Sequence, residues 1–288
     1  DYLVSTYGGG AIQLTIAQYS MGTGGVTVGD RITIRGANNP VIAHTSHAPW
    51  IGSSNINVTS TSVSPFTLND GSTVENISVF YPNQNTNSAP ITYPGTFYIT
   101  SCFDASIVRC FVSNPYKFVD AGRTHERLRV LECAGYPLYM GIHSYQSYDI
   151  DYYERNHFNP THFYGIGNTL LEWVKANGYA YYIDDCDAPY IEQNFLYGYK
   201  YGAYLNNNYA VMFALNGMDG TSYGVTDVGG VSDHISGNIF NIFGASYTSP
   251  SDTYAVSTTG TGTRIEGNEI TTAALCIKVS GPYTVVSG

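Results

Sequence analysis

The sequence predicts an all-β chain that folds as a single-stranded right-handed parallel β-helix, a solenoid of about ten coils. Three observations predict this fold. Short β-type runs fill most of the 288 residues, one template of apolar and polar positions recurs along them, and an Asn occupies the same template position in several copies. Such a repeat indicates stacked coils that share their strands but differ in their turns.

The template is an apolar residue, two variable residues, an Asn or apolar residue, one variable residue and a final apolar residue. Its copies begin at residues 74, 107, 128, 153, 191, 210, 235 and 265. The intervals are irregular, as expected of a solenoid in which some turns lengthen. A β-sandwich is the alternative, but its strands do not repeat one template in a single register.

Four Asn residues support the choice of a solenoid, and each stands between two short β runs. They are Asn156, Asn194, Asn238 and Asn268. Asn tolerates a left-handed backbone and therefore suits a bend between strands. The side-chain amides can then stack from coil to coil, which resembles the asparagine ladder of right-handed parallel β-helices.

The remaining elements follow from this pattern. Helical periodicity is confined to residues 11–18 and 169–176, where we expect short helices. We expect residues 1–50 to form an N-terminal cap with entry strands. Residues 51–288 are predicted to form the β-helix, with long turns around 156–180 and 216–232. Because the pattern breaks off at Gly288, the sequence also suggests a β-helix truncated at its C-terminus.

The composition excludes several classes of function. Charged residues make up only 12% of the chain, and the net charge is −10. Stacked coils would bring like charges into register, so a low charged fraction suits a solenoid. The acidic balance argues against nucleic acid as a partner, and no apolar run is long enough for membrane insertion. The five Cys lack a metal-binding spacing, so we expect buried thiols, no metal and no cofactor.

Residues 128–163 carry a resemblance to a known family. They contain Gly-Tyr-Pro-Leu at 135–138, Tyr-Asp-Ile-Asp at 148–151 and His-Phe-Asn-Pro at 157–160, and the similarity continues to about residue 205. This stretch resembles the pectate-lyase-superfamily β-helix proteins related to glycoside hydrolase family 28. Members include secreted polysaccharide hydrolases and lyases, and phage tailspikes that hold or cut surface glycans. The resemblance implies a polysaccharide or cell-surface glycan as partner, an extracellular location and, for a tailspike-like chain, a homotrimer.

A shorter match concerns the chemistry. Asp184-Asp185-Cys186 resembles the Asp-Asp-Cys of polygalacturonases, which implies one carboxylate as acid and one as base for water. The chain departs from that family on the next coil, which reads Tyr-Gly-Tyr-Lys-Tyr-Gly at 197–202 in place of Gly-His-Gly. No Arg-Ile-Lys triplet follows.

Strand alternation places the candidate catalytic residues on one outer face. Residues 141–144, 181–184 and 202–206 align as equivalent strands, and if their apolar side chains point inward, the alternate ones point outward. Glycan hydrolysis needs an acid and a second carboxylate roughly 5 to 9.5 Å apart. The predicted catalytic residues are Asp184, paired with Asp185 or Asp187, and His143.

Tyrosine is the commonest aromatic residue, with 27 copies, and several of them crowd the same coils as the carboxylates. Aromatic rings stack on the apolar faces of sugars while their hydroxyl groups form hydrogen bonds. The predicted substrate-binding residues are Tyr145, Tyr182, Tyr204, Asn206 and His157.

Two rival clusters stay open. Glu154 and Glu192 share one template position on successive coils. Two carboxylates on adjacent coils lie close enough to repel each other, which raises the pKa of one of them. Because Glu75 and Glu266 occupy the same position, a recurrent surface residue is the simpler interpretation. His157, with His162 and Asp151 in the densest titratable cluster beside Asp149, could hold a metal, but the spacing is not tight and structural histidines are favoured.

The sequence thus predicts an extracellular polysaccharide-active protein, a glycoside hydrolase with paired carboxylates. One alternative is a non-catalytic glycan-binding tailspike or surface-fibre module. Another is a polysaccharide lyase, which needs a base and positive charge beside a uronate. The cations available for that chemistry are Lys117, Arg123, Arg155 and Lys200.

Overall fold

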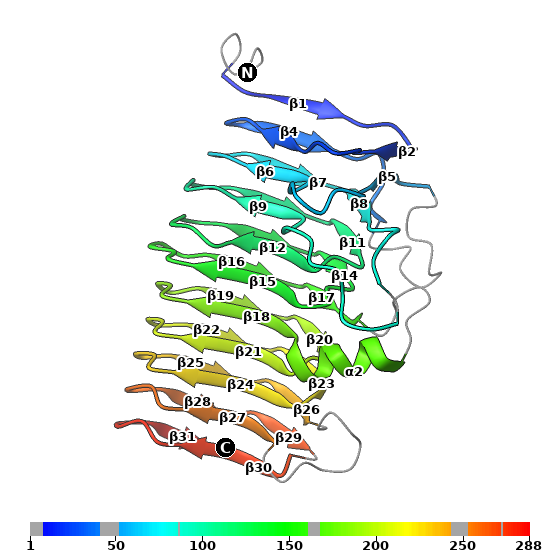
Figure 1. The fold of residues 1–288 in the computed structure, drawn as a ribbon. Coiled ribbons are helices and arrows are strands. Elements are labelled where there is room, and N and C mark those ends of the chain that lie inside the picture. The colour runs from blue at the N-terminus through cyan, green and yellow to red at the C-terminus, as the bar shows by residue number, and fades with distance from the viewer. Residues whose placement is uncertain (1–7, 41–51, 86, 161–167, 243–252, 272) are drawn as a thin grey trace.

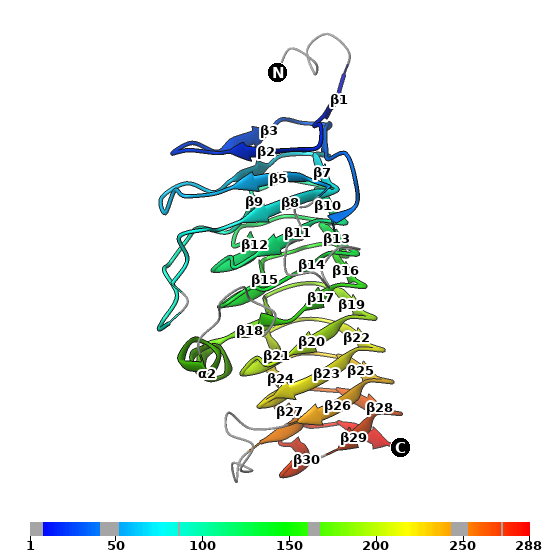
Figure 2. The same ribbon diagram turned by 90° about the vertical axis from the view of Figure 1, so that its right-hand side faces the viewer.

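The computed structural model describes residues 8–40, 52–85, 87–160, 168–242, 253–271 and 273–288, and its strands wind into a solenoid with three parallel faces (Figures 1 and 2). Every strand pairs in parallel with its equivalents on neighbouring coils, as in the pairing of β4 with β1 and β7. The prediction of an all-β, single-stranded right-handed parallel β-helix is confirmed.

Each coil contributes one strand to each of three sheets, which we call sheets A, B and C. Sheet A has eleven strands: β1 (Gly10–Gln13), β4 (Ile32–Arg35), β7 (Thr73–Glu75), β10 (Ser106–Val108), β13 (Arg129–Leu131), β16 (Tyr152–Glu154), β19 (Tyr190–Glu192), β22 (Met212–Ala214), β25 (His234–Ser236), β28 (Arg264–Glu266) and β31 (Val285–Ser287).

Sheet B has ten strands: β2 (Ala17–Ser20), β5 (Ser54–Asn57), β8 (Ile77–Phe80), β11 (Phe111–Ser113), β14 (Ala134–Gly135), β17 (His157–Phe158), β20 (Phe195–Tyr197), β23 (Gly217–Thr221), β26 (Ile239–Ile242) and β29 (Glu269–Thr271). Sheet C also has ten: β3 (Val26–Val28), β6 (Phe66–Leu68), β9 (Phe97–Ile99), β12 (Lys117–Ala121), β15 (Met140–Tyr145), β18 (Tyr179–Asp184), β21 (Tyr201–Asn206), β24 (Tyr223–Val228), β27 (Tyr254–Thr258) and β30 (Leu275–Val279).

The described helix, α2 (Asn168–Asn177), lies between β17 and β18 and projects beside sheet C (Figure 2). It agrees with the helix expected at 169–176. The helix expected at 11–18 is wrong, because these residues contribute to β1 and β2. Residues 216–232 are not one long turn, since they contain β23 and β24 joined at Ser222. The cap boundary at residue 50 stays a prediction, while β1 to β3 pair in parallel with the next coil.

The core fills the lumen with stacked apolar side chains. On sheet A the middle residue of most three-residue strands points inward, as with Val74, Ile107 and Val130, all fully buried. On sheet C an aromatic stack continues from Phe66 through Phe97, with ring centroids 5.5 Å apart. Strand alternation therefore sends the neighbours of these residues to the outer faces.

An internal amide ladder holds the corner between sheets A and B. The backbone N–H of Asn156 donates to Oδ1 of Asn194 at 2.8 Å, and the same bond joins Asn194 to Asn216 at 2.9 Å. The ladder continues through Asn238 to Asn268. The predicted stacking is thus present and includes Asn216, which the sequence template placed outside the ladder.

The left-handed backbone expected at these Asn residues belongs instead to the residue before each one. Arg155, Gln193 and Leu215 have φ values of 53°, 58° and 57°. The Asn that follows turns its amide inward, where it is buried and bonded. Cys133 occupies the equivalent ladder position on the preceding coil, where its N–H donates to Oδ1 of Asn156.

Charged residues of opposite sign stack on the outer corners of sheet A. Glu132 lies between two arginines of neighbouring coils, 3.7 Å from Nη1 of Arg109 and 3.4 Å from Nε of Arg155. Arg127 lies between Asp104 and Asp149 in the same way, at 2.9 Å from each. Because the coils stack in register, equivalent positions on neighbouring coils lie close together. On these corners such positions carry opposite charges, which attract each other, so the solenoid can hold charged residues there.

Candidate functional site

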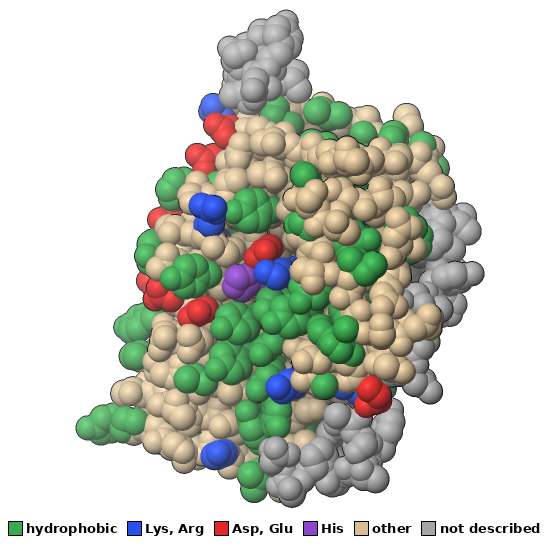
Figure 3. Space-filling model, in the orientation of Figure 1, with side chains coloured by type: hydrophobic (Ala, Val, Ile, Leu, Met, Phe, Trp, Pro, Cys, Tyr) green, Lys and Arg blue, Asp and Glu red, His purple; other side chains and the backbone are tan. Residues whose placement is uncertain are grey.

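The outer face of sheet C carries a continuous band of tyrosine side chains. Tyr182 and Tyr204 stack with ring centroids 5.4 Å apart and an interplanar angle of 14°. A second row beside it contains the stacked pair Tyr179 and Tyr201, at 4.9 Å and 13°. This row continues through Tyr223 to Tyr254. Figure 3 shows hydrophobic side chains running down this face of the molecule.

The band arises from strand alternation within four successive strands of sheet C, β18, β21, β24 and β27. Tyr182 and Tyr204 are register partners in β18 and β21, between inward-facing residues such as Ile183 and Leu205. Burial, followed by the influence of neighbouring tyrosines, raises the pKa of Tyr179 to about 12. The Tyr179 hydroxyl group therefore remains protonated at neutral pH and can donate a hydrogen bond.

Helix α2 extends the aromatic surface at one side. Trp173 lies with its ring centroid 6.0 Å from that of Tyr139, which in turn contacts Tyr179 at 6.0 Å. The insertion between β17 and β18 thus adds an indole to the tyrosine band. An insertion of this kind is where a solenoid acquires its specificity.

A His–Asp pair adjoins the band. His143 Nδ1 lies 2.7 Å from Oδ1 of Asp120, and the His143 ring contacts Tyr182 edge to face at 5.5 Å. Lys117 Nζ lies 3.0 Å from the other carboxylate oxygen of Asp120. Burial opposes the ionisation of Asp120, but the hydrogen bond from His143 and the charge of Lys117 outweigh it, so the pKa of Asp120 is lowered. Asp120 is therefore ionised at neutral pH.

Arg123 and Tyr98 lie on the same side of the pair. Nε of Arg123 donates to the hydroxyl oxygen of Tyr98, and Tyr98 is the register partner of Asp120 in β9. This end of the band therefore combines two cations with a histidine and an ionised carboxylate. Asp120 was not among the residues predicted from the sequence. An alignment of residues 117–121 with residues 140–144 places it beside His143.

Asp184, Asn206 and Tyr145 form the next row of the same face. Asp184 is the register partner of both Tyr145 and Asn206. Its Oδ1 accepts a hydrogen bond from Nδ2 of Asn206 at 2.7 Å. The structure therefore brings together six of the residues singled out from the sequence: His143, Tyr145, Tyr182, Asp184, Tyr204 and Asn206.

Asp185 and Asp187 lie outside this row, because the chain turns directly after β18. Asp185 has a left-handed backbone, with φ of 55°, and its exposed carboxylate accepts from Nε2 of Gln146 at 3.2 Å. Asp187 is exposed on the turn and forms an isolated bridge with Tyr209. Strand alternation no longer predicts side-chain direction in this turn, so the pairing of Asp184 with either residue stays a prediction.

His157 lies on sheet B, away from the tyrosine band. Its ring contacts Phe195 edge to face at 4.9 Å. The metal cluster considered around it is not assembled: Asp151 points into the core and Asp149 pairs with Arg127, while His162 lies outside the described residues. In the described part of the chain, no group of three His, Cys, Asp or Glu side chains converges on a metal position.

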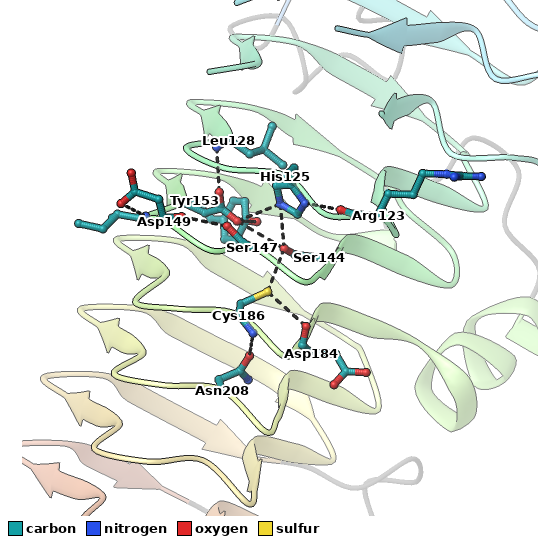
Figure 4. A network of polar contacts seen from close by, with 12 residues as sticks. Arg123, His125, Leu128, Ser144, Ser147, Asp149, Tyr153, Asp184, Cys186 and Asn208 are labelled. Carbon is teal, nitrogen blue, oxygen red and sulfur yellow. Dashed lines mark hydrogen bonds and ion pairs between the residues drawn. The ribbon is translucent and has the colours of Figure 1, made fainter. Parts of the chain in front are cut away.

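A second polar network lies inside the solenoid at the corner between sheets C and A (Figure 4). His125 Nε2 lies 3.1 Å from Asp151 Oδ2 and 3.2 Å from Ser144 Oγ, and Tyr153 donates to the same Asp151 oxygen at 2.8 Å. Burial opposes the protonation of His125, but its hydrogen bond to Asp151 outweighs this and raises the pKa of His125.

Ser, His and Asp also form the catalytic triads of hydrolases, but the arrangement of Ser144, His125 and Asp151 differs from that of a triad. In a triad the acid and the nucleophile contact different ring nitrogens. In this network both contact Nε2 of His125, and Nδ1 faces the carbonyl oxygen of Arg123 at 2.7 Å. His125 and Ser144 are buried. The network therefore serves to satisfy polar groups in the core.

Four of the five cysteines, Cys102, Cys110, Cys133 and Cys186, are buried free thiols, as expected, whereas Cys276 is exposed. Among the described residues, no helix has the length and apolar character needed to cross a membrane.

Comparison with known proteins agrees with the fold. No protein-family model and no curated protein matches the sequence. DFA-IIIase from Arthrobacter chlorophenolicus A6, without its lid and in complex with GF2, is similar with a TM-score of 0.59 at 8% identity over 96% of this chain and 79% of that chain. The same enzyme in complex with GF2 gives a TM-score of 0.56 at 11% identity over 96% and 83%. At these identities the similarity supports the β-helix fold alone.

Proposed function

We propose that this chain is a carbohydrate-active enzyme that binds a polysaccharide along the tyrosine band of sheet C and hydrolyses it beside His143. The observation that carries the proposal is the continuity of the band with the His143–Asp120 pair. Aromatic rings bind the apolar faces of sugars, while their hydroxyl groups bind the sugar oxygens. An extended band favours a chain-like glycan over a small ligand.

The reacting groups in this proposal are His143 and Asp184. His143 pairs in register with Tyr182, and Asp184 lies two residues after Tyr182 in the same strand. The side chains of His143 and Asp184 therefore point to the same face of sheet C. A strand spacing of about 4.8 Å and a rise of about 3.3 Å per residue place their Cα atoms roughly 8 Å apart. Side chains that leave one face of a sheet in parallel roughly keep the separation of their Cα atoms, and reacting groups held that far apart leave room for a water beside the glycosidic bond.

Asp120 fixes the orientation of the imidazole. When Nδ1 donates to Asp120, Nε2 faces outward and can carry a proton toward the substrate. In the proposed step the His143 imidazolium gives that proton to the glycosidic oxygen as the bond to the anomeric carbon breaks. Asp184 accepts a proton from the water that attacks the same carbon.

A reducing-end assay on a polysaccharide panel tests the proposal. We expect the chain to release reducing ends from at least one polymer, and Asp184→Asn to lower the rate by at least about a hundredfold while the thermal unfolding transition is unchanged. Undiminished hydrolysis by a folded Asp184→Asn variant would refute the assignment. Binding of a polymer without any cleavage would favour a glycan-binding module.

Elimination from a uronate is a second candidate, favoured by the two cations near His143. Lys117 and Arg123 could neutralise a uronate carboxylate while His143 removes the adjacent proton. Elimination leaves an unsaturated sugar that absorbs ultraviolet light, whereas hydrolysis does not. The absorbance of the products on uronate polymers therefore separates the two reactions.

A further inference from the structure

Sheet A carries an open cavity on a different face from the tyrosine band. Its volume is about 260 Å³, and it is lined by Arg129, Leu131, Tyr152 and Glu154. These residues belong to the neighbouring strands β13 and β16, where Arg129 pairs with Tyr152 and Leu131 pairs with Glu154. On the next coil, Glu192 is the register partner of Glu154.

Glu154 and Glu192 place two like charges in register on this face. Elsewhere on its outer corners a charge lies beside an opposite charge, as Glu132 does between two arginines. Glu154 has such a partner, with Oε2 2.9 Å from Nη1 of Arg155. Across the described residues, no hydrogen bond or ion pair reaches the Glu192 carboxylate. Burial, and then the charge of Glu154, raises the pKa of Glu192.

Two aromatic residues of the face stack beside this pair. Tyr152 and Tyr190 stack with ring centroids 5.6 Å apart and an interplanar angle of 18°. The Arg129 guanidinium lies 5.9 Å from the centre of the Tyr152 ring. Stacking between coils orders these side chains before a ligand arrives, which lowers the entropic cost of binding.

The charges of the cavity select the class of ligand. The Arg129 guanidinium would repel a cation, and the two carboxylates would repel an anion. A neutral molecule rich in hydroxyl groups can donate to the carboxylates and accept from the guanidinium, while Tyr152 and Leu131 cover its apolar patches.

We propose that this cavity, together with Glu192, is a second carbohydrate-binding site that takes a neutral sugar ring of an oligosaccharide. In this site Glu154 and Glu192 accept hydrogen bonds from adjacent hydroxyl groups, and Arg129 donates to a ring or hydroxyl oxygen. The choice of ligand class rests on the groups of this cavity and not on the function proposed for sheet C.

Nuclear magnetic resonance titration tests this site separately from the band. Cellohexaose, mannohexaose and xylohexaose are added to the full chain and to a Tyr204→Ala variant, and the methyl resonances of Leu131 report on the cavity. We expect at least one hexasaccharide to shift these resonances in both proteins. Glu192→Gln should weaken that binding about tenfold, because an ionised acceptor is replaced by a weaker neutral one.

Glu266→Gln is the matched control, because Glu266 ends the equivalent strand β28 and pairs with His234 at 2.8 Å. It should leave the Leu131 shifts unchanged. Shifts confined to the tyrosine band would overturn the second site and leave the sheet C proposal standing. Equal binding by Glu192→Gln and wild type would also overturn it, and a panel that perturbs neither face counts against both sites.

Discussion

Nδ1 of His143 lies 2.7 Å from Oδ1 of Asp120, across the boundary between two coils whose strands are register partners. The two residues are 23 positions apart in sequence. The pair therefore depends on the stacking of β12 on β15. It engages Nδ1 of the imidazole, while the same ring contacts Tyr182 of the tyrosine band edge to face.

Asp120→Asn should lower kcat by about ten- to a hundredfold with little change in KM, because the amide no longer stabilises the imidazolium or fixes its orientation. Steady-state kinetics on the polymer identified in the reducing-end assay measures both constants. Asp219→Asn, on sheet B, is the control and should retain full activity. An equal rise of KM in place of a fall in kcat would show that Asp120 serves binding only.

Tyr204→Ala should weaken the binding of an oligosaccharide by roughly three- to tenfold, as expected for the loss of one aromatic contact. The melting temperature should change little, because the ring lies on the outer face. Isothermal titration calorimetry together with a thermal melt checks both expectations. Tyr209→Ala is the control, since Tyr209 is 55% exposed on the turn after β21. Unchanged affinity in the Tyr204 variant would remove the band from the binding site.

Asn216→Ala should lower the free energy of unfolding by about 2 to 3 kcal/mol, because it leaves buried polar groups without partners. Asn216 Oδ1 accepts from both the backbone N–H and Nδ2 of Asn194, and its own Nδ2 donates to the carbonyl oxygen of Ile191. Urea denaturation measures the loss. Asn241→Ala, on the outer face of sheet B, should cost far less, and equal losses would contradict the role of the internal ladder.

Asp233 provides a prediction about pH. Its Oδ2 is buried with no hydrogen-bond partner in the described residues, and burial, then the charge of Asp227, raises the pKa of Asp233 to about 8. Between the ordinary value of 3.8 and about 8, the folded chain therefore holds one more proton than the unfolded chain. The stabilisation contributed by Asp233 is complete below about pH 4 and falls as the pH rises toward 8, by about 1.4 kcal/mol per pH unit.

Asp233→Asn should remove most of that slope and stabilise the chain at pH 8 more than at pH 5. The Asn oxygen can still accept from the N–H of Val211, which lies 2.9 Å from Oδ1 of Asp233. Urea midpoints measured from pH 5 to pH 8 for both proteins check this expectation. Parallel stability curves would show that Asp233 titrates normally in the folded chain.

Much of this architecture follows from local patterns, and the exceptions have physical causes. Alternation placed His143, Tyr182 and Asp184 on one face because β15 and β18 are regular strands. It failed for Asp185, where the backbone turns left-handed directly after the strand. Asp120 was missed because its role comes from a contact between coils, which a single sequence reveals only after the coils are aligned.

The same limits apply to the fold. The Asn template found the ladder because each amide must repeat at a fixed position after a two-residue turn. It skipped Asn216 because the template there was aligned to residues 210–215. Residues 11–18 carry an apolar spacing that also suits a helix, but β1 pairs along its whole length with β4. Pairing between coils overrides local helical periodicity at that point.

The corners of the solenoid differ in how freely the chain could be lengthened. From β10 to β29 the corner between sheets A and B keeps two residues, because each amide must meet the next one in register. The corner between sheets B and C ranges from a single residue, Ser222, to the stretch 159–178 that contains α2. New segments grafted at this second corner, between β20 and β21 for example, would therefore leave the internal ladder intact. They would also extend beside the tyrosine band, so this surface could be reshaped without rebuilding the scaffold.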